Sequence, residues 1–302
     1  GIPSGVQYSN PRRVVDRLGN ASVRRSRAEI GRHSARQPSL ERIQAVLAPE
    51  QNGLNGRLDA LFNSFHRLST QPAARNERRG VVVAAKALAA DFRIARTQLE
   101  EMRVPLGNAV DDNLREVNRL SEQVAHLNNS IRRQESKSHE ASDLRDERDR
   151  LLDSLAQMAG TRVVEHKDGT VTVSMSNGSA LVSREKHHQL STQIVAGNLE
   201  LRLADDDGVP SIDLPSGTIG GELEGLLTSY NADIGGSIQE LDQLAFGLVQ
   251  GMNGLHTTGF GLDGNSGRDF FTIGGGIPGA AATIEINAAL DADPDLIAAT
   301  VN

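Results

Sequence analysis

The sequence predicts a mainly α-helical protein with an inserted β module, that is, an elongated helical bundle or coiled-coil body plus a small antiparallel β domain. Apolar residues recur every three or four positions through most of residues 1–160 and again over residues 219–256. Between them, over residues 161–215, apolar residues alternate with polar ones and turn dipeptides separate the runs. With no Trp, 2 Tyr and 7 Phe, the core must be built from aliphatic residues, as in long helix bundles. The expected domains are a discontinuous helical body, residues 1–160 and 216–302, and a β module at residues 161–215.

The first part of the chain predicts a short strand and three helices. Val6 and Tyr8 alternate with polar residues before a turn at Asn10-Pro11, which indicates a strand. Helical spacing follows over residues 12–47, 54–68 and 75–102. Pro38 lies inside the first of these segments, and we expect it to break or kink the helix because proline lacks the amide donor.

The clearest periodic signal lies in the next helical segment. Its seven apolar residues span 21 positions in six steps, a mean of 3.5, which is the period of a coiled-coil seam. An ordinary bundle helix with one core-facing stripe explains the spacing nearly as well, and both interpretations stay open. The seam residues are Val110, Leu114, Val117, Leu120, Val124, Leu127 and Ile131.

A charged helix then changes into a hairpin at a defined boundary. Ser142 is expected to cap the start of this helix, and Gly160 fits the left-handed position that ends helices. Asp168-Gly169 is a strong tight-turn signal between two runs of alternating valines. These four residues mark the predicted helix-to-hairpin boundary.

The sequence contains no recognisable set of catalytic, cofactor-binding or metal-binding residues. It has no Cys, so thiol chemistry and thiolate metal sites are excluded. The stretch from Asp263 resembles the start of a calcium loop, but Arg268 stands at the expected glycine and Gly274 at the expected glutamate. We therefore expect a turn stabilised by local hydrogen bonds, no cofactor, and no enzymatic activity.

Charge is unevenly distributed along the chain. The net charge is -7, yet residues 1–160 hold 26 Lys and Arg against 20 Asp and Glu. A solvated basic helix surface beside an acidic β region explains this, and complementary faces between subunits of one assembly are the alternative. Nucleic acid is not an expected partner, because the Arg residues are dispersed among acids and aromatics are few. No apolar run approaches the roughly 18 residues of a membrane span, so no membrane partner is expected.

Several stretches, taken in order, resemble one family over nearly the whole chain. The most specific are "DLRDERDRLLDSLAQMAGTRVVEHKDGTVTVSMSNGSALV" and "MNGLHTTGFGLDGNSGRDFF"; "GVQYSNPRRVVDRL" and "LREVNRLSEQVAHLNNSI" precede them. They resemble the bacterial flagellar hook-associated protein 1 family, the hook–filament junction proteins. The resemblance further implies that this chain is a core fragment lacking both terminal helical segments of the family.

The resemblance implies a structural, non-enzymatic axial subunit of the bacterial flagellum, with a role in motility. Such a subunit is exported by the flagellar type III apparatus without a cleaved signal peptide, and lies outside the cell. Its implied partners are further copies of itself in a ring, the hook protein, the second hook-associated junction protein and an export chaperone. In that setting helices would stand along the tube and the β module would project outward.

Two groups of alternatives stay open at this point. The generic heptads suit the second junction protein or a flagellin-like subunit equally well. A different class would be a secreted coiled-coil adhesin or fibre whose β module binds a receptor.

Overall fold

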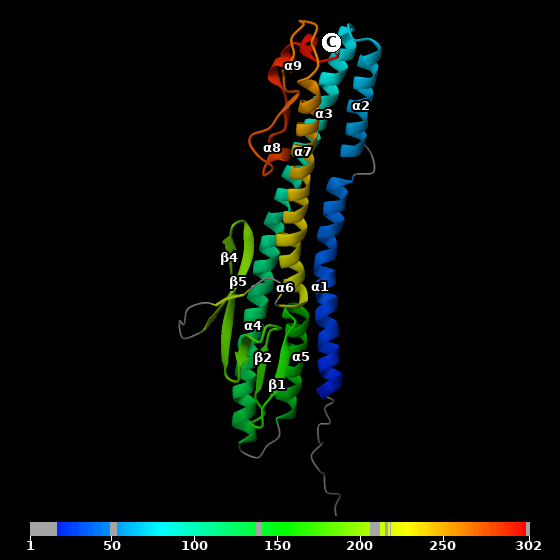
Figure 1. The fold of residues 1–302 in the computed structure, drawn as a ribbon. Coiled ribbons are helices and arrows are strands. Elements are labelled where there is room, and N and C mark those ends of the chain that lie inside the picture. The colour runs from blue at the N-terminus through cyan, green and yellow to red at the C-terminus, as the bar shows by residue number, and fades with distance from the viewer. Residues whose placement is uncertain are drawn as a thin grey trace, which may run out of the picture. The chain divides into compact units, whose positions relative to one another are not determined.

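The computed structural model describes residues 17–48, 53–136, 141–205, 212–214, 217 and 219–299 (Figure 1). The fold is mainly α-helical with a six-stranded antiparallel sheet inserted between helices, which confirms the predicted fold class. The predicted strand at Val6 and Tyr8, and the turn at Asn10-Pro11, lie outside the described residues. By its contacts the chain divides into two compact units, Gly1–Arg36 with Val110–Leu227 and Gln37–Ala109 with Thr228–Asn302.

Among the described residues five helices precede the sheet, and the helices predicted over residues 54–68 and 75–102 are found within two residues of those limits. The helices are α1 (Arg17–Leu47), α2 (Leu54–Thr70), α3 (Arg75–Glu101), α4 (Arg103–Glu135) and α5 (Ser142–Ala159). The expectation that Pro38 breaks the first helix is wrong, because α1 continues through it. A proline removes one hydrogen bond from a helix that has 31 residues to supply the others. Pro105 is in the first turn of α4, where an amide donor is not needed.

The sheet is a simple meander in which each strand pairs with the next in the sequence. Its strands are β1 (Arg162–Glu165), β2 (Val171–Ser174), β3 (Ala180–Ser183), β4 (Lys186–Val195), β5 (Asn198–Asp205) and β6 (Ile212–Leu214). These strands fall within the predicted β module at residues 161–215. Contacts group the sheet with α4 and α5 in the first unit, so its independence as a domain stays a prediction.

After the sheet the chain returns to helical structure and ends in short elements. These are α6 (Gly221–Thr228), a π-helix (Ser229–Ile234), α7 (Gly235–His256), β7 (Phe271–Thr272), α8 (Ala280–Thr283), β8 (Glu285–Ile286), α9 (Ala288–Ala292) and a 3-10 turn (Pro294–Leu296). β7 and β8 form a two-stranded ladder in which Phe271 pairs with Ile286.

The second unit has a core of aliphatic residues from α2, α3 and α7, closed by the C-terminal segment. Phe270 anchors that segment, with its ring centroid 5.2 Å from the ring of Phe65. Arg78 of α3 is fully buried and donates to the carbonyl of Ile297 at 2.6 Å and to that of Pro72 at 2.9 Å. Burial lowers the pKa of Arg78, and the bonds to backbone carbonyls give partners to its Nε and Nη1. The arginine thus fixes the last described residues against α3.

His256, at the end of α7, joins two further backbone segments of the second unit. Its Nδ1 lies 2.7 Å from the carbonyl oxygen of Arg268, which can only accept, so Nδ1 donates. Its Nε2 accepts from the amide of Ala298 at 2.9 Å. The bond at Nε2 requires the neutral ring, because a protonated Nε2 cannot accept. Burial lowers the pKa of His256 below its ordinary value and so favours this neutral form.

We expect the chain to lose stability on acidification through His256. Because the folded-state pKa is lowered, the unfolded state binds the extra proton first, and stability falls as the pH drops below about 6.5. The free energy of unfolding from urea titrations at pH 7.5 and 5.5 should therefore fall less in His256→Gln than in the unmodified chain. His66→Gln, a change at an exposed histidine of the same unit, should keep the full difference. An equal loss in all three proteins would contradict the assignment.

Candidate functional site at the helix-to-sheet junction

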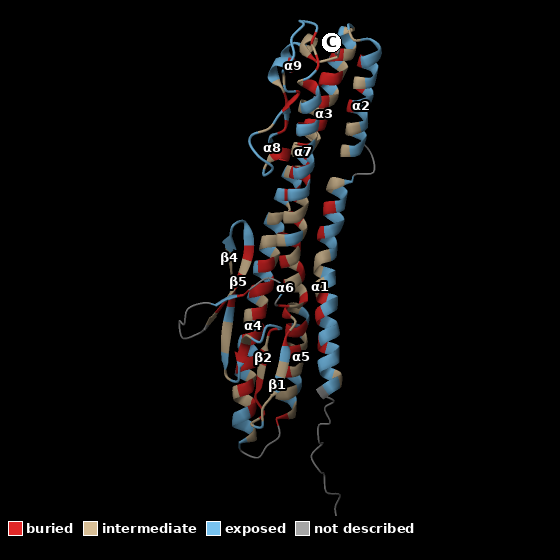
Figure 2. Ribbon diagram, viewed as in Figure 1, coloured by how far each residue is buried: buried red, intermediate tan, exposed pale blue. Residues whose placement is uncertain are grey.

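The predicted seam lies along α4 and faces the interior of the first unit. Six of its seven residues are at most 4% exposed, and Leu127 is half-buried. Buried residues recur along α4 and α5 with exposed ones between them (Figure 2). The stripe therefore builds the core of this chain itself, and supercoiling of the helix stays a prediction.

Two asparagines of α4 bind the sheet by pairing with its backbone. Asn128 donates from Nδ2 to the carbonyl of Val171 at 2.9 Å and accepts from the amide of Val171 at 3.1 Å. Asn118 makes the same pair of bonds with Leu190, both at 2.8 Å. A carboxamide carries one donor and one acceptor like a peptide group, so each asparagine adds one rung to a β ladder.

The length of β3 explains why these two rungs are needed. β3 pairs with β2 from Thr172 onward, and with β4 only at Lys186 and His187. Val171 of β2 and Leu190 of β4 therefore lie outside the stretches of these strands that pair with β3. Both are at least 97% buried, and buried backbone groups must find a partner. Asn118 and Asn128 of α4 bond the backbone groups of Leu190 and Val171 that the short strand β3 does not reach.

Arg148 of α5 holds the same junction from the other side. It is 2% exposed, and its Nη1 donates to Oδ1 of Asn128 at 2.9 Å and to the carbonyl of Gly169 at 2.7 Å. The first bond orients the asparagine amide, and the second fixes the turn between β1 and β2. One buried cation thus connects α4, α5 and the first hairpin.

An ion-pair network lies beside this buried cluster. Arg145 of α5 forms two bonds of 2.7 Å with Glu135 near the end of α4, and a further bond with Glu165 at the end of β1. The hydrogen bond from Arg145 holds the pKa of Glu135 below its usual range. The same bond raises the pKa of Arg145. Both helices and β1 are therefore joined by charge-assisted bonds.

Three of the four predicted boundary residues have the expected geometry, and one does not. Gly160 ends α5 in the left-handed conformation, with φ 61° and ψ 43°. Asp168 accepts from the amide of Thr170 at 3.1 Å, and Gly169 takes the positive φ of 78° that the turn requires. The expectation that Ser142 caps α5 is wrong. Buried Ala141 occupies the cap position without a side-chain bond, and Ser142 is the first helical residue.

The chain enters and leaves the sheet at a close backbone contact. A Cβ on Gly160 would lie 2.5 Å from the Cα of Gly220, closer than any side chain allows. α1 and α6 meet in the same manner, because a Cβ on Gly225 would lie 2.3 Å from the carbonyl oxygen of Arg32. Arg24 adds ion pairs from α1 to α5, at 2.8 Å to Asp153 and 3.2 Å to Asp149. Helices and sheet are thus packed as one unit.

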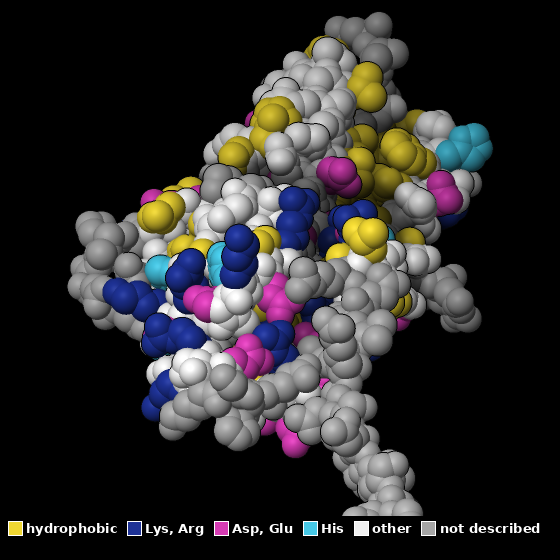
Figure 3. All heavy atoms as spheres, turned by 90° about the horizontal axis from the view of Figure 1, so that it is seen from below, with side chains coloured by type: hydrophobic (Ala, Val, Ile, Leu, Met, Phe, Trp, Pro, Cys, Tyr) yellow, Lys and Arg dark blue, Asp and Glu magenta, His cyan; other side chains and the backbone are white. Residues whose placement is uncertain are grey.

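Outside this junction, the stretch that begins at Asp263 forms a turn held by local bonds. Asp263 accepts from the amide of Asn265 at 3.2 Å and pairs with Arg268, which lowers the pKa of Asp263. The expected locally bonded turn is confirmed. Among the described residues no three His, Asp or Glu side chains gather in a way that could hold a metal ion. Within that part of the chain no helix has the length and apolar character needed to cross a bilayer. On the face in Figure 3, basic and acidic side chains are interspersed.

Comparison with known proteins places this fold in one family. The family model described as the flagellar hook-associated protein FlgK helical domain matches residues 40–271. The chain belongs to the FlgK family. The matched region contains α4, α5, the whole sheet and the junction between them.

Individual FlgK relatives resemble the chain over most of its length. It is 28% identical to flagellar hook-associated protein 1 of Salmonella typhimurium over 278 residues, which is 90% of the chain and 50% of that protein. The protein of the same name from Bacillus subtilis is 25% identical, over 94% of the chain and 62% of the relative. The chain therefore spans about half to three-fifths of the length of these relatives.

A solved structure shows that the fold is shared as well. The structure of the flagellar hook junction protein FlgK from Burkholderia pseudomallei superposes with a TM-score of 0.75. The match covers 84% of this chain and 47% of that one, at 22% sequence identity. At this identity the likeness supports the fold of the chain.

Asn118, Asn128 and Arg148 were not predicted from the sequence, although two of them stand at positions where a signal was present. Asn128 stands four residues after Val124 and three before Ile131, which is a stripe position. A polar residue at such a position requires a buried partner. Arg148 carries the same signal, because it stands four residues after Leu144 and three before Leu151. Asn118 does not fall on the stripe in this way and carries no comparable signal.

Proposed function

We propose that this chain is the core of a non-enzymatic structural subunit that joins the flagellar hook to the filament. The observation that carries this proposal is the family match over residues 40–271, which includes the whole helix-to-sheet junction. The relatives are named flagellar hook-associated protein 1, and the solved homologue is described as a hook junction protein. The chain's own architecture supports a structural role, because the buried side chains of Asn128 and Arg148 bond to backbone groups and to each other.

The bonding at the junction suits a subunit that bears mechanical load. Asn128, Arg148 and Val171 belong to three different elements and share buried hydrogen bonds. Such a network opens as a whole, because breaking one bond leaves the remaining buried groups without partners. A load on the sheet is thereby passed to α4 and α5.

The location and partners follow from the same proposal. The full-length subunit lies outside the cell on the flagellum, is exported by the flagellar type III apparatus without a cleaved signal peptide, and assembles as a ring of identical copies. Its neighbours are the hook protein and the second hook-associated junction protein, and an export chaperone binds it before export. Residues 161–215 form the part that projects from the helical body, residues 1–160 and 216–302. No cofactor takes part.

Deletion of the parent gene in the source bacterium tests this function. We expect motility to be lost, hooks without attached filaments in electron micrographs, and filament protein released into the medium. Reintroducing the intact gene should restore all three properties. Normal filaments in the deletion strain would contradict the proposal. If the strain swims normally but no longer adheres to surfaces, the protein is an adhesin or fibre instead.

A further inference from the structure

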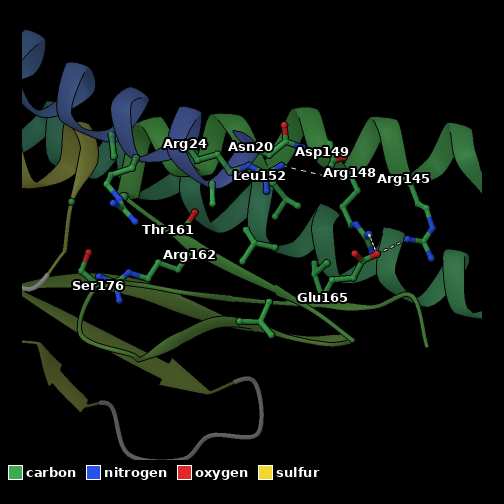
Figure 4. A pocket seen from close by; sticks show the side chains of 18 of the residues that line it. Asn20, Arg24, Arg145, Arg148, Asp149, Leu152, Thr161, Arg162, Glu165 and Ser176 are labelled. Atoms are coloured by element: carbon green, nitrogen blue, oxygen red, sulfur yellow. Dashed lines mark hydrogen bonds and ion pairs between the residues drawn. The ribbon is translucent and has the colours of Figure 1, made fainter. Parts of the chain in front are cut away.

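A groove of about 1310 Å³ lies in the first unit between α1, α5 and β1 (Figure 4). All four residues of β1 line it. Ala28 of α1 and Leu152 of α5 are both at least 91% buried and form an apolar part of the lining. The groove is thus bounded by two helices and by the first strand of the sheet.

β1 leaves backbone hydrogen-bonding groups unused at the edge of the sheet. It pairs on one side only, with β2. The amide of His166 donates to the carbonyl of Thr170 at 2.8 Å, which sets the alternation of the β1–β2 ladder. By this alternation Val164 bonds toward β2, whereas the N–H and C=O of Val163 point to the opposite edge. The bonds of Val171, which are made on the side away from β1, agree with this phase. Among the described residues the backbone of Val163 therefore has no hydrogen-bond partner.

The groove also carries a surplus of positive charge. Its lining holds five arginines and four carboxylates. Each of these carboxylates pairs with an arginine: Glu29 with Arg32, Asp149 with Arg24, and both Glu135 and Glu165 with Arg145. The side chains of Arg25 and Arg162 form no ion pair within the part of the chain that the structure describes. Two cations at the groove are thus left for an anionic group from outside.

The side chains of β1 specify which strand would fit beside it. Arg162 and Val164 lie on the same face of β1, because side chains two positions apart in a strand point to the same side. Both are exposed, Val164 by 57%. Opposite charges and apolar pairs directly across a ladder are the stabilising combinations. A fitting strand therefore carries an acidic residue opposite Arg162 and an apolar residue opposite Val164, with one residue between them that bonds to Val163.

We propose that this groove binds an extended acidic segment of a partner protein, which pairs with β1 as an additional antiparallel strand. The segment reads apolar, any residue, acidic from its N-terminus, because antiparallel pairing reverses the order Arg162, Val163, Val164. Backbone bonds to Val163 supply affinity, and the two side-chain pairs supply selectivity. Arg25, on the α1 side, adds positive charge that favours acidic over basic segments.

A free anion and a helix fit these observations less well than a strand. A free anion would pair with Arg162 but would leave the backbone of Val163 unbonded. A helix has its own backbone groups bonded internally and could not extend the ladder of β1. Binding at this groove goes beyond the junction role proposed above, and it can fail without affecting that role.

NMR titration and amide exchange of the 302-residue chain with designed peptides test this proposal. The probe is a capped six-residue peptide of threonines with valine at its second position and glutamate at its fourth. The Val163 amide should shift on titration, and its exchange should slow about tenfold when the free peptide is at ten times its Kd. A peptide with lysine in place of the glutamate should bind about fivefold more weakly. A peptide with proline between the valine and the glutamate should not bind, because proline cannot donate to the carbonyl of Val163.

Three variants of the chain sharpen the test. Arg162→Glu should invert the preference, weakening the glutamate peptide and strengthening the lysine peptide by about fivefold each. Arg133→Glu makes the same charge change at an exposed arginine of α4 outside the groove, and should leave both affinities within about twofold. Val163→Pro removes an N–H that the β1–β2 ladder does not use, so binding should be lost while the Val173 amide stays slow to exchange. If Val163→Pro also speeds Val173, the inverted preference of Arg162→Glu decides.

Four results would overturn the proposal. Slow exchange of Val163 in dilute chain without peptide would show that the edge of β1 is already bonded. Protection of Val163 that rises with protein concentration alone would show that a second copy occupies the groove. Equal affinities for the glutamate, lysine and proline peptides would show that binding is not through strand pairing. If inorganic phosphate shifts Val163 as the glutamate peptide does, the groove is a site for free anions.

Discussion

Replacing Arg148 by alanine is expected to lower the free energy of unfolding by about 3 kcal/mol. The guanidinium is buried and donates to Asn128 and to the carbonyl of Gly169. Its removal leaves that carbonyl without this donor, frees the asparagine amide to turn, and creates a cavity next to the first hairpin. Urea unfolding of the variant measures the loss.

Two companion variants separate the causes of this loss. Arg150→Ala removes an exposed arginine from the same helix and should change stability by no more than about 0.5 kcal/mol. Arg148→Met restores most of the volume but none of the hydrogen bonds, so it should recover only the cavity part. If Arg148→Met were as stable as the unmodified chain, the hydrogen bonds would not hold the junction.

Leu120→Asp is expected to be the most damaging change on α4, with a cost of about 4 kcal/mol or more. Leu120 is 3% exposed and lies in the stripe that faces the interior. A carboxylate at this position would be buried without a partner. This cost is a large share of the roughly 5–15 kcal/mol that stabilises a domain. The first unit should therefore be unfolded without urea, or unfold at a much lower urea concentration than in the unmodified chain.

Gln123→Asp is the matched control for this substitution. Gln123 is exposed on the same helix, so the variant adds the same carboxylate in contact with water. Its urea midpoint should remain close to that of the unmodified chain. Equal midpoints for the two variants would mean that the stripe is not buried in solution and serves a partner subunit.

The helices and the start of the sheet could be predicted because their signals are local. The periodicity around Leu120, the left-handed position of Gly160 and the turn at Asp168 each depend on a few neighbouring residues. β4 was not predicted as a strand, because its sequence "KHHQLSTQIV" is mostly polar. It is a strand because it forms a ladder with β5 over eight residue pairs, which is a long-range property.

The bonds that form the junction are long-range as well, and local rules do not reveal them. Asn128 pairs with Val171, 43 positions later, and Asn118 pairs with Leu190, 72 positions later. The predicted cap at Ser142 and the predicted break at Pro38 were wrong, because each rested on neighbouring residues alone. The burial of Ala141 placed the start of α5 one residue earlier than the cap rule predicts, and the length of α1 allowed the helix to continue through Pro38. Tertiary packing decided these positions.

The sheet and helices α4 and α5 are expected to unfold together, because asparagine and arginine side chains join them. Native-state hydrogen exchange tests this most directly, by comparing opening free energies for amides of Val173 in β2, Leu120 in α4 and Leu155 in α5. We predict equal values in the unmodified chain. In Arg148→Ala we predict that all three values fall together. If Val173 opened at a clearly lower free energy than the two helical amides, the sheet would be an independent module that unfolds without α4 and α5.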